Sequence, residues 1–198
     1  MHGMIGMTEL LLHTSLNRQQ RQFAQAAHKS GESLLNLINE ILDYSKVEAS
    51  KVELEKIDFS LLELLDDICY LQSEPASRKG LNLNSIVDPS LPEILTGDPT
   101  KIRQVVMNLV SNSIKFTHSG NVNVRARASR TLESDQYANI EIVVEDEGIG
   151  MDQETQERVF DAFIQADAST TREYGGTGLG LAISRNYIDI MIGDISIS

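Results

Sequence analysis

The sequence predicts an α+β protein: a helical hairpin at the N-terminus, then an α/β sandwich with helices on one face of a mixed sheet. Two observations point to this class. The first fifty residues carry apolar side chains at helical spacing and contain no proline. The rest of the chain mixes helical periodicity with short apolar segments of period two, most of them adjacent in sequence. We therefore expect a helical domain at 1–48 and a second domain at 52–198.

Two helices are expected in the first domain. The first runs to His13, a turn follows at 14–17, and the second helix covers 19–45. Along the second helix, apolar and small side chains recur at alternating steps of three and four, which is typical of a coiled-coil seam. The seam consists of Ala27, Ser30, Leu34, Leu37, Ile41 and Tyr44. Because two helices cannot enclose a core, we expect the seam to meet a second copy in a four-helix bundle. The alternative is packing against the chain's own second domain.

The second domain is expected to contain strands and helices in close succession. The predicted strands are 52–55, 81–87, 121–129, 138–145 and a last one that starts at 194–198. The predicted helices are 61–73, 99–116, 153–160 and 179–191. Ser60 is an expected N-cap, and Asp98 followed by Pro99 combines an N-cap with proline at the first helical position.

Composition limits the partners and the compartment. The net charge of −12 argues against nucleic acid and against docking on an anionic membrane. No segment approaches the roughly 18–20 apolar residues of a membrane span, and the start of the chain lacks the basic region of a signal peptide. The single cysteine, Cys69, lies in an apolar run and is predicted to be a buried thiol. A cytoplasmic protein is expected.

The helix predicted at 99–116 carries a polar stripe beside its apolar face. Asn108, Asn112 and Lys115 follow one another at spacings of four and three, so they stack along one edge. Asparagine oxygens suit Mg²⁺, which completes its shell with water and phosphates, and a lysine neutralises phosphate charge. The alternative is an ordinary solvated polar face.

A carboxylate and two glycines follow the strand predicted at 138–145. Asp146 can accept a hydrogen bond from an exocyclic amine, which is how adenine could be recognised. Gly148 and Gly150 let the backbone approach a ligand without a side-chain clash. The alternative is a simple turn of aspartate and glycine.

A glycine-rich segment opens the last predicted helix. Its residues are Gly175, Gly176, Thr177, Gly178, Leu179, Gly180 and Leu181. Main-chain amides at a helix start form a ready site for an anion such as phosphate. The spacing matches neither a dinucleotide fingerprint nor a P-loop. The polar stretch 165–174 is expected to form a mobile lid that brings Arg172 to the phosphates; the alternative is a merely flexible loop.

Taken together, these segments resemble the sensor histidine kinases of two-component signalling, especially the hybrid type, with the GHKL ATPase fold. The resemblance covers essentially the whole chain. The matching segments are the N box at 108–116, the glycine boxes at 146–150 and 175–181, the F box at 159–163, and the dimerisation hairpin at 6–12 and 37–46.

The resemblance implies ATP and Mg²⁺ as cofactors and assigns a role to each site residue. Asp146 would bind the adenine amine, with Gly148 and Gly150 beside the base. Asn108 and Asn112 would hold the metal and phosphates. Lys115 would lie beside the phosphates. Gly176, Gly178 and Gly180 would donate main-chain amides within the segment that includes Thr177 and Leu179. Phe160 and Phe163 would anchor the lid.

The resemblance also implies a reaction and partners. The expected reaction transfers the γ-phosphoryl group of ATP to a histidine, for relay to an aspartate of a response regulator. A homodimer is expected through the N-terminal helices, in the cytosolic part of a membrane-anchored sensor. The alternatives are a non-catalytic dimeric ATP-binding switch and a GHKL ATPase of the topoisomerase or chaperone kind.

The sequence departs from the family pattern in three places. The acceptor histidine is expected a few residues before the start of the chain, so the chain as given should bind ATP without phosphorylating itself. None of the chain's histidines, His2, His13, His28 and His118, is assigned as the acceptor. The family's sheet is expected to continue past Ser198, and Ile192 stands where the family more often has glycine.

Overall fold

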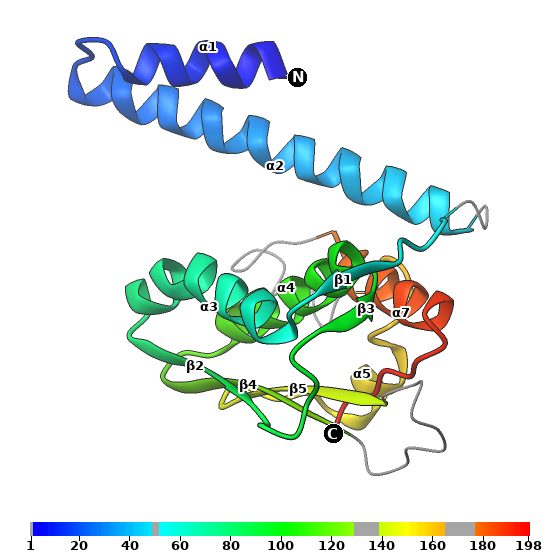
Figure 1. The fold of residues 1–198 in the computed structure, drawn as a ribbon. Coiled ribbons are helices and arrows are strands. Elements are labelled where there is room, and N and C mark those ends of the chain that lie inside the picture. The colour runs from blue at the N-terminus through cyan, green and yellow to red at the C-terminus, as the bar shows by residue number, and fades with distance from the viewer. Residues whose placement is uncertain (1, 49–51, 129–138, 165–176) are drawn as a thin grey trace. The chain divides into compact units, whose positions relative to one another are not determined.

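The chain forms two compact units, Met1–Lys51 and Val52–Ser198. The computed structural model describes residues 2–48, 52–128, 139–164 and 177–198 (Figure 1). The first unit is a helical hairpin, and the second combines helices with a two-stranded and a three-stranded sheet. The α+β class predicted from the sequence is confirmed.

The hairpin consists of α1 (His2–Leu12) and α2 (Arg18–Glu48). A reciprocal cap starts α2: the Gln20 N–H donates to Asn17 Oδ1 at 2.9 Å, and the Asn17 N–H donates to Gln20 Oε1 at 3.1 Å. Gly31 permits close packing of the helices, because a Cβ there would lie 3.2 Å from a side-chain carbon of α1. A helical hairpin with a short connection is the result.

The second unit contains two sheets. Their strands are β1 (Ile57–Phe59), β2 (Leu81–Val87), β3 (Leu95–Gly97), β4 (Gly120–Ala128) and β5 (Ile140–Asp146). In the larger, mixed sheet, β4 lies at the centre, parallel to β2 and antiparallel to β5. Val122 of β4 lies opposite Leu83 on one side and Asp146 on the other. This register fixes where β5 ends. β1 and β3 form a separate antiparallel pair.

Helices cover one face of the mixed sheet (Figure 1). They are α3 (Leu61–Arg78), α4 (Pro99–Phe116) and α7 (Gly180–Ile190). The short α5 (Gln153–Arg158) follows β5 in the chain. Both predicted caps are confirmed: Ser60 Oγ accepts from the Glu63 N–H at 3.3 Å, and Asp98 Oδ1 from the Lys101 N–H at 2.9 Å. Asp98 Oδ2 also accepts from the Glu55 N–H at 3.1 Å, so this buried carboxylate has a main-chain donor at each oxygen.

The core of the second unit lies between α3, α4 and the sheet. Its buried members are Leu61, Leu64, Leu65, Ile68, Ala76, Leu81, Val106, Val110, Ile114, Val122, Val124 and Ala126. Cys69 packs against this core and is half-buried, and burial raises the pKa of its thiol. The thiol is thereby held in its unreactive form.

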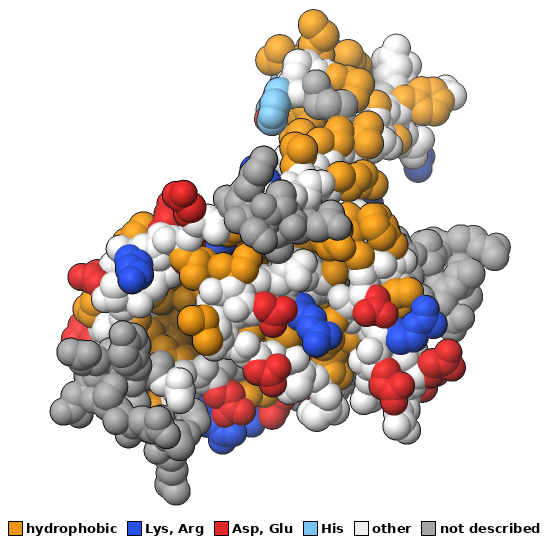
Figure 2. Space-filling view, turned by 90° about the vertical axis from the view of Figure 1, so that its right-hand side faces the viewer, with side chains coloured by type: hydrophobic (Ala, Val, Ile, Leu, Met, Phe, Trp, Pro, Cys, Tyr) orange, Lys and Arg blue, Asp and Glu red, His pale blue; other side chains and the backbone are white. Residues whose placement is uncertain are grey.

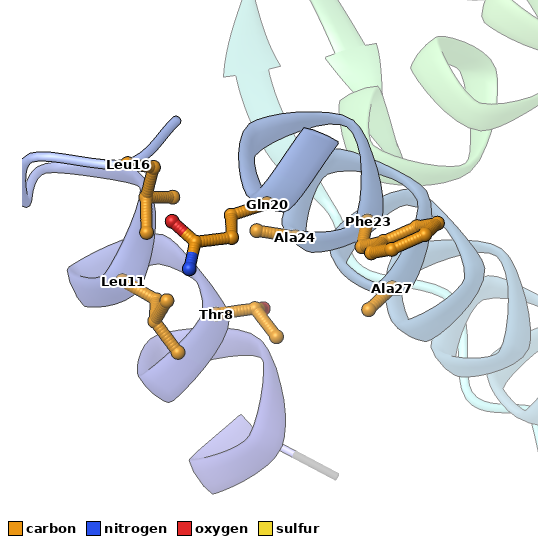
Figure 3. Close-up of a pocket in the computed structure, with 7 residues that line it drawn as sticks. All are labelled: Thr8, Leu11, Leu16, Gln20, Phe23, Ala24 and Ala27. Atoms are coloured by element: carbon orange, nitrogen blue, oxygen red, sulfur yellow. The ribbon is translucent and has the colours of Figure 1, made fainter. Parts of the chain in front are cut away.

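The hairpin, in contrast, exposes many of its apolar side chains at the surface (Figure 2). A groove of about 320 Å³ lies between α1 and α2 near their connection (Figure 3). It is lined by Thr8, Leu11, Leu16, Gln20, Phe23, Ala24 and Ala27. Phe23, at its rim, is 65% exposed, so the two helices do not close over their own apolar surface.

Three predicted elements are wrong. The strand predicted at 52–55 is irregular, and the pairing begins instead at 57, where β3 supplies a partner that the sequence pattern did not reveal. The helix predicted to end at 73 continues through Pro75 to Arg78, because Ala76 packs into the core and this outweighs the lost hydrogen bond. Residues 194–198 form no strand, because no described strand pairs with them.

Candidate functional site

The candidate site is built around α4, because the segment after β5 and the start of α7 both contact this helix. Asn108 and Asn112 stack along its edge as predicted, with Asn112 Nδ2 donating to Asn108 Oδ1 at 3.3 Å. Asn108 Nδ2 donates in turn to Ser184 Oγ of α7 at 2.9 Å. These bonds fix the orientation of the Asn108 amide, so that its oxygen points toward Asn112.

Five residues after Asn108 on α4, a serine holds the carboxylate at the end of β5. Ser113 Oγ donates to Asp146 Oδ2 at 2.8 Å, and the Gly148 N–H donates to Asp146 Oδ1 at 3.0 Å. Each carboxylate oxygen has two lone pairs, so each retains the capacity to accept one more hydrogen bond. Asp146 is therefore held in one orientation and is still able to accept from a ligand.

The glycine after this carboxylate lies tight against the end of α4. A Cβ at Gly148 would lie 2.9 Å from the carbonyl oxygen of Phe116, too close for any side chain. The next residue, Ile149, donates its N–H to the same carbonyl at 3.3 Å. Gly150 has φ 68°, a conformation that glycine adopts without strain. The segment after β5 is thus attached to the last turn of α4.

The glycine turn before α7 requires glycine for two reasons. Gly178 has φ 73°, and a Cβ there would lie 2.9 Å from the carbonyl oxygen of Ile164. Phe163 donates its N–H to the Gly178 carbonyl at 3.0 Å, which joins the F-box segment to this turn. Phe163 has φ 65° and is 66% exposed. Positive φ in a bulky residue costs of order 1–3 kcal/mol and is frequent at functional sites.

The start of α7 lies directly against the asparagine pair. A Cβ at Gly180 would lie 2.5 Å from Asn108 Oδ1, so only glycine allows this approach. Among the described side chains none caps α7 at Leu179, although the Thr177 hydroxyl accepts from the Leu179 N–H at 3.1 Å. Amides at the positive end of a helix therefore lie next to the candidate metal ligands, an arrangement that favours an anion.

Two cationic side chains contact aromatic rings near these elements. Lys115 Nζ lies 4.6 Å from the centre of the Phe116 ring, and partial burial lowers the pKa of Lys115. The Arg185 guanidinium lies 5.6 Å from the centre of the Phe160 ring, which links α7 to the F-box segment. Such contacts are worth roughly 0.5–1 kcal/mol at exposed sites.

Asn108, Asn112 and Lys115 lie on α4, and Asp146, Gly148 and Gly180 lie against it, whereas two predicted site residues lie outside the described residues. Those two are Arg172 and Gly176, together with the lid predicted at 165–174. Ser113 and Ser184 belong to the site and were not predicted. The only signal in the sequence was a hydroxyl residue on the otherwise apolar side of each helix.

The side chains fit a hard cation such as Mg²⁺ that takes most of its coordination shell from the phosphates of a bound molecule and few ligands from the protein. Within the described part of the chain, no cluster of three or more histidine, cysteine or acidic side chains could hold a metal. The available donors are the amide oxygens of Asn108 and Asn112, and Mg²⁺ takes few protein ligands when phosphates complete its shell. Among the described residues, no helix is long and apolar enough to cross a membrane.

Two protein families match the chain. Residues 97–198 match the family described as histidine kinase-, DNA gyrase B-, and HSP90-like ATPase, and residues 1–50 match the His Kinase A (phospho-acceptor) domain. These matches cover the segments in which the sequence resembles the catalytic domain and the dimerisation hairpin.

Curated relatives are longer than this chain. The signal transduction histidine-protein kinase BarA of Escherichia coli is 42% identical over 196 residues, which are 99% of this chain and 21% of BarA. The sensor protein GacS of Pseudomonas syringae is 43% identical over 197 residues, 100% of this chain and 22% of GacS. The chain therefore spans about a fifth of the length of these relatives.

Solved structures agree with the sequence matches. Full-length ShkA in complex with AMPPNP has a TM-score of 0.79 and 32% identity, covering 96% of this chain and 38% of ShkA. The histidine kinase AdeS of Acinetobacter baumannii shares the fold at a TM-score of 0.66 and 18% identity, covering 93% of this chain and 80% of AdeS. The expected GHKL fold is confirmed. The chain belongs to the histidine kinase-, DNA gyrase B- and HSP90-like ATPase family and, within it, to the sensor histidine kinases.

Proposed function

We propose that this chain is the region of a sensor histidine kinase that binds ATP with Mg²⁺ and directs its γ-phosphoryl group to a histidine. The carrying observation is that two segments meet α4: Asp146 is bonded to Ser113, and Gly180 lies against Asn108, five residues earlier on the helix. The first segment presents a fixed carboxylate and the second presents helix-start amides beside two asparagines. The carboxylate suits the base of a nucleotide, and the amides with the two asparagines suit its phosphates.

The base is proposed to bind at the Asp146 carboxylate. Its orientation is set by Ser113 and by the Gly148 N–H, so it accepts from an exocyclic amine without rearranging. An amine donates to a carboxylate, whereas the carbonyl at the same place on guanine would face it with another acceptor. The site should therefore prefer adenine to guanine. Gly148 and Gly150 leave room beside the base.

The phosphates are proposed to bind between α4 and the start of α7. Asn108 and Asn112 would hold Mg²⁺, which neutralises phosphate charge when it is bound. Lys115 adds a positive charge, and the amides near Gly178 and Gly180 donate to phosphate oxygens. We extend the phosphate site to Arg172 and Gly176, and we propose that Phe160 and Phe163 anchor the lid.

The hairpin is proposed to dimerise, and a response regulator is proposed to receive the phosphoryl group. The apolar seam of α2 supports a dimer, because Leu34, Leu37 and Ile41 are 46%, 37% and 42% exposed in the single chain. Membership of the sensor histidine kinases supports the regulator partner. We assign the hairpin to 1–48 and the ATP-binding domain to 52–198.

Nucleotide titration of Asp146→Asn tests the base assignment. Loss of the carboxylate should weaken MgATP binding roughly 10- to 100-fold, the effect of losing a hydrogen bond to a charged group. Glu147→Gln is the matched control, since it removes the neighbouring carboxylate, which accepts from Asn121 Nδ2 at 2.8 Å, and leaves the Asp146 carboxylate in place. Equal affinity of Asp146→Asn and the unaltered chain in calorimetry would refute the assignment.

Phosphoryl transfer needs a separate test, which also decides between a kinase and a non-catalytic switch. The chain would be extended at its N-terminus with the residues of BarA that precede the matched region and incubated with γ-labelled ATP. Acid-labile label on histidine is the expected result, and Asn112→Ala should abolish it. An extended chain that binds ATP and never incorporates label would identify a switch.

A further inference from the structure

We propose that Lys79, which follows α3, positions the base side of the nucleotide site by fastening the last turn of α4. Lys79 lies outside the recognised motifs and would act through α4, without contact with the nucleotide. The inference rests on the proposed function, specifically on recognition of the base by Asp146.

The Lys79 ammonium group meets a cluster of main-chain acceptors. Its Nζ atom lies 2.8, 2.6 and 3.3 Å from the carbonyl oxygens of Ile114, Lys115 and Thr117. The last carbonyls of a helix have no partner within the helix and carry its negative dipole end. An ammonium group has three donors, one for each of these oxygens. The lysine thus caps α4 from a neighbouring helix.

The main chain of Lys79 is itself fixed, so the ammonium group is presented from a defined position. The Lys79 N–H donates to the Ala76 carbonyl and the Gly80 N–H to the Ser77 carbonyl, both at 3.0 Å. Ala76 is only 1% exposed, which anchors this end of α3 in the core. The contact therefore joins two rigid elements.

The turn that Lys79 caps is the one that holds the base-binding segment. Ser113 donates to Asp146 at its beginning, and the Phe116 carbonyl accepts from Ile149 at its end. Both ends of the Asp146–Ile149 segment are thus attached to a single helical turn. If that turn frays, the carboxylate loses the orientation on which adenine recognition depends.

The phosphate side has a further support outside the capped turn, in which Lys115 alone of its proposed ligands lies. Asn108 lies more than a turn earlier on α4 and is held by Ser184 of α7. Loss of the cap should therefore weaken contacts to the base more than contacts to the phosphates. ATP and GTP share the same phosphates, so the ratio of their dissociation constants reports the base side alone.

The test is calorimetric titration of the folded chain with MgATP and MgGTP. The preference for ATP is the dissociation constant for GTP divided by that for ATP. Lys79→Met should reduce this ratio about tenfold, the effect of losing one hydrogen bond to a charged group. Arg78→Met is the matched control and should leave the ratio unchanged. Arg78 stands one position earlier, pairs with Glu74 within α3, and has a side chain that is 77% exposed.

The outcomes separate this inference from the proposed function. If the unaltered chain binds ATP and GTP equally, base recognition at Asp146 is wrong and the role of Lys79 falls with it. If the unaltered chain prefers ATP and Lys79→Met retains the full preference, only the role of Lys79 is refuted. Should Lys79→Met fail to fold, Lys79→Gln decides by the same ratio, since its amide replaces three charged donors with a weaker, neutral one.

Discussion

The hairpin (Met1–Lys51) and the second unit, here called the ATPase unit (Val52–Ser198), differ in how much of their apolar surface they bury. In the ATPase unit, Leu65, Ile68 and Val110 are fully buried between helices and sheet. In the hairpin, Ala24 is the only buried hydrophobic residue among those described, while Leu34 and Ile41 remain 46% and 42% exposed. Both units have amphipathic helices, so the difference lies in the number of neighbours.

Neighbours decide whether an amphipathic helix is stable alone. α4 packs on α3, α7 and the sheet, so its apolar face is covered within one chain. Among the described elements of its unit, α2 has only α1 beside it. A hairpin with one uncovered face gains stability from a second copy, and that stability depends on protein concentration. The ATPase unit should unfold independently of concentration.

The largest expected effect tests the closed core. Leu65→Ala should destabilise the ATPase unit by about 2–5 kcal/mol, because it leaves a cavity at a residue with 0% exposure. Chemical denaturation measures the loss. The hairpin control, Leu34→Ala, should change the stability of the ATPase unit by less than about 0.5 kcal/mol. If both variants lowered the free energy of unfolding of the ATPase unit equally, the two units would not be stabilised independently.

The second prediction tests the open face of α2. Ile41→Glu should weaken dimerisation at least about tenfold, because each protomer would place a carboxylate in the apolar seam. Light scattering across a concentration series measures the dissociation constant. Asn39→Glu adds the same charge at an exposed position off the seam and should have little effect. If both variants dimerise as the unaltered chain does, the seam is not the interface.

The third prediction concerns a site residue that belongs to the ATPase unit alone. Ser113→Ala should weaken ATP binding roughly 3- to 10-fold, because Asp146 loses one of its two fixing hydrogen bonds. The control is Ser111→Ala, whose hydroxyl donates only to the Asn108 carbonyl of its own helix at 3.0 Å. Dimerisation should be unaffected in both. A similar loss of affinity in the two serine variants would argue against a specific role for Ser113.

The smallest effect is a pH dependence of nucleotide binding. Burial disfavours the ammonium form of Lys115 and lowers its pKa, whereas a bound phosphate favours that form and raises the pKa again. Binding therefore takes up protons at alkaline pH, and affinity falls as pH rises through the range in which free Lys115 loses its proton. Calorimetry in buffers of different ionisation enthalpy measures this uptake. Lys115→Arg should remove this proton uptake. The dissociation constant of the dimer, measured in parallel, should be the same with lysine or arginine at position 115.

Local patterns in the sequence predicted the helix starts and the family. Ser60 and Asp98 cap their helices as expected, because an N-cap bond forms within three residues and needs no distant partner. The stacking of Asn108 and Asn112 is likewise a property of one helix. The glycine segments and their order were sufficient to identify the family, which the comparisons confirmed.

Contacts between distant segments could not be predicted from these patterns. The strand at 57–59 depends on pairing with 95–97, and the helix continues past Pro75 because Ala76 is buried in the core. The bonds from Ser113 to Asp146 and from Lys79 to the end of α4 join residues more than thirty positions apart. Sequence alone thus determined the hairpin, the helix caps and the nucleotide motifs, because each depends on short-range spacing. Tertiary structure decided the strand partners and the supports of the site, because hydrogen-bond partners across elements exist only once the elements pack.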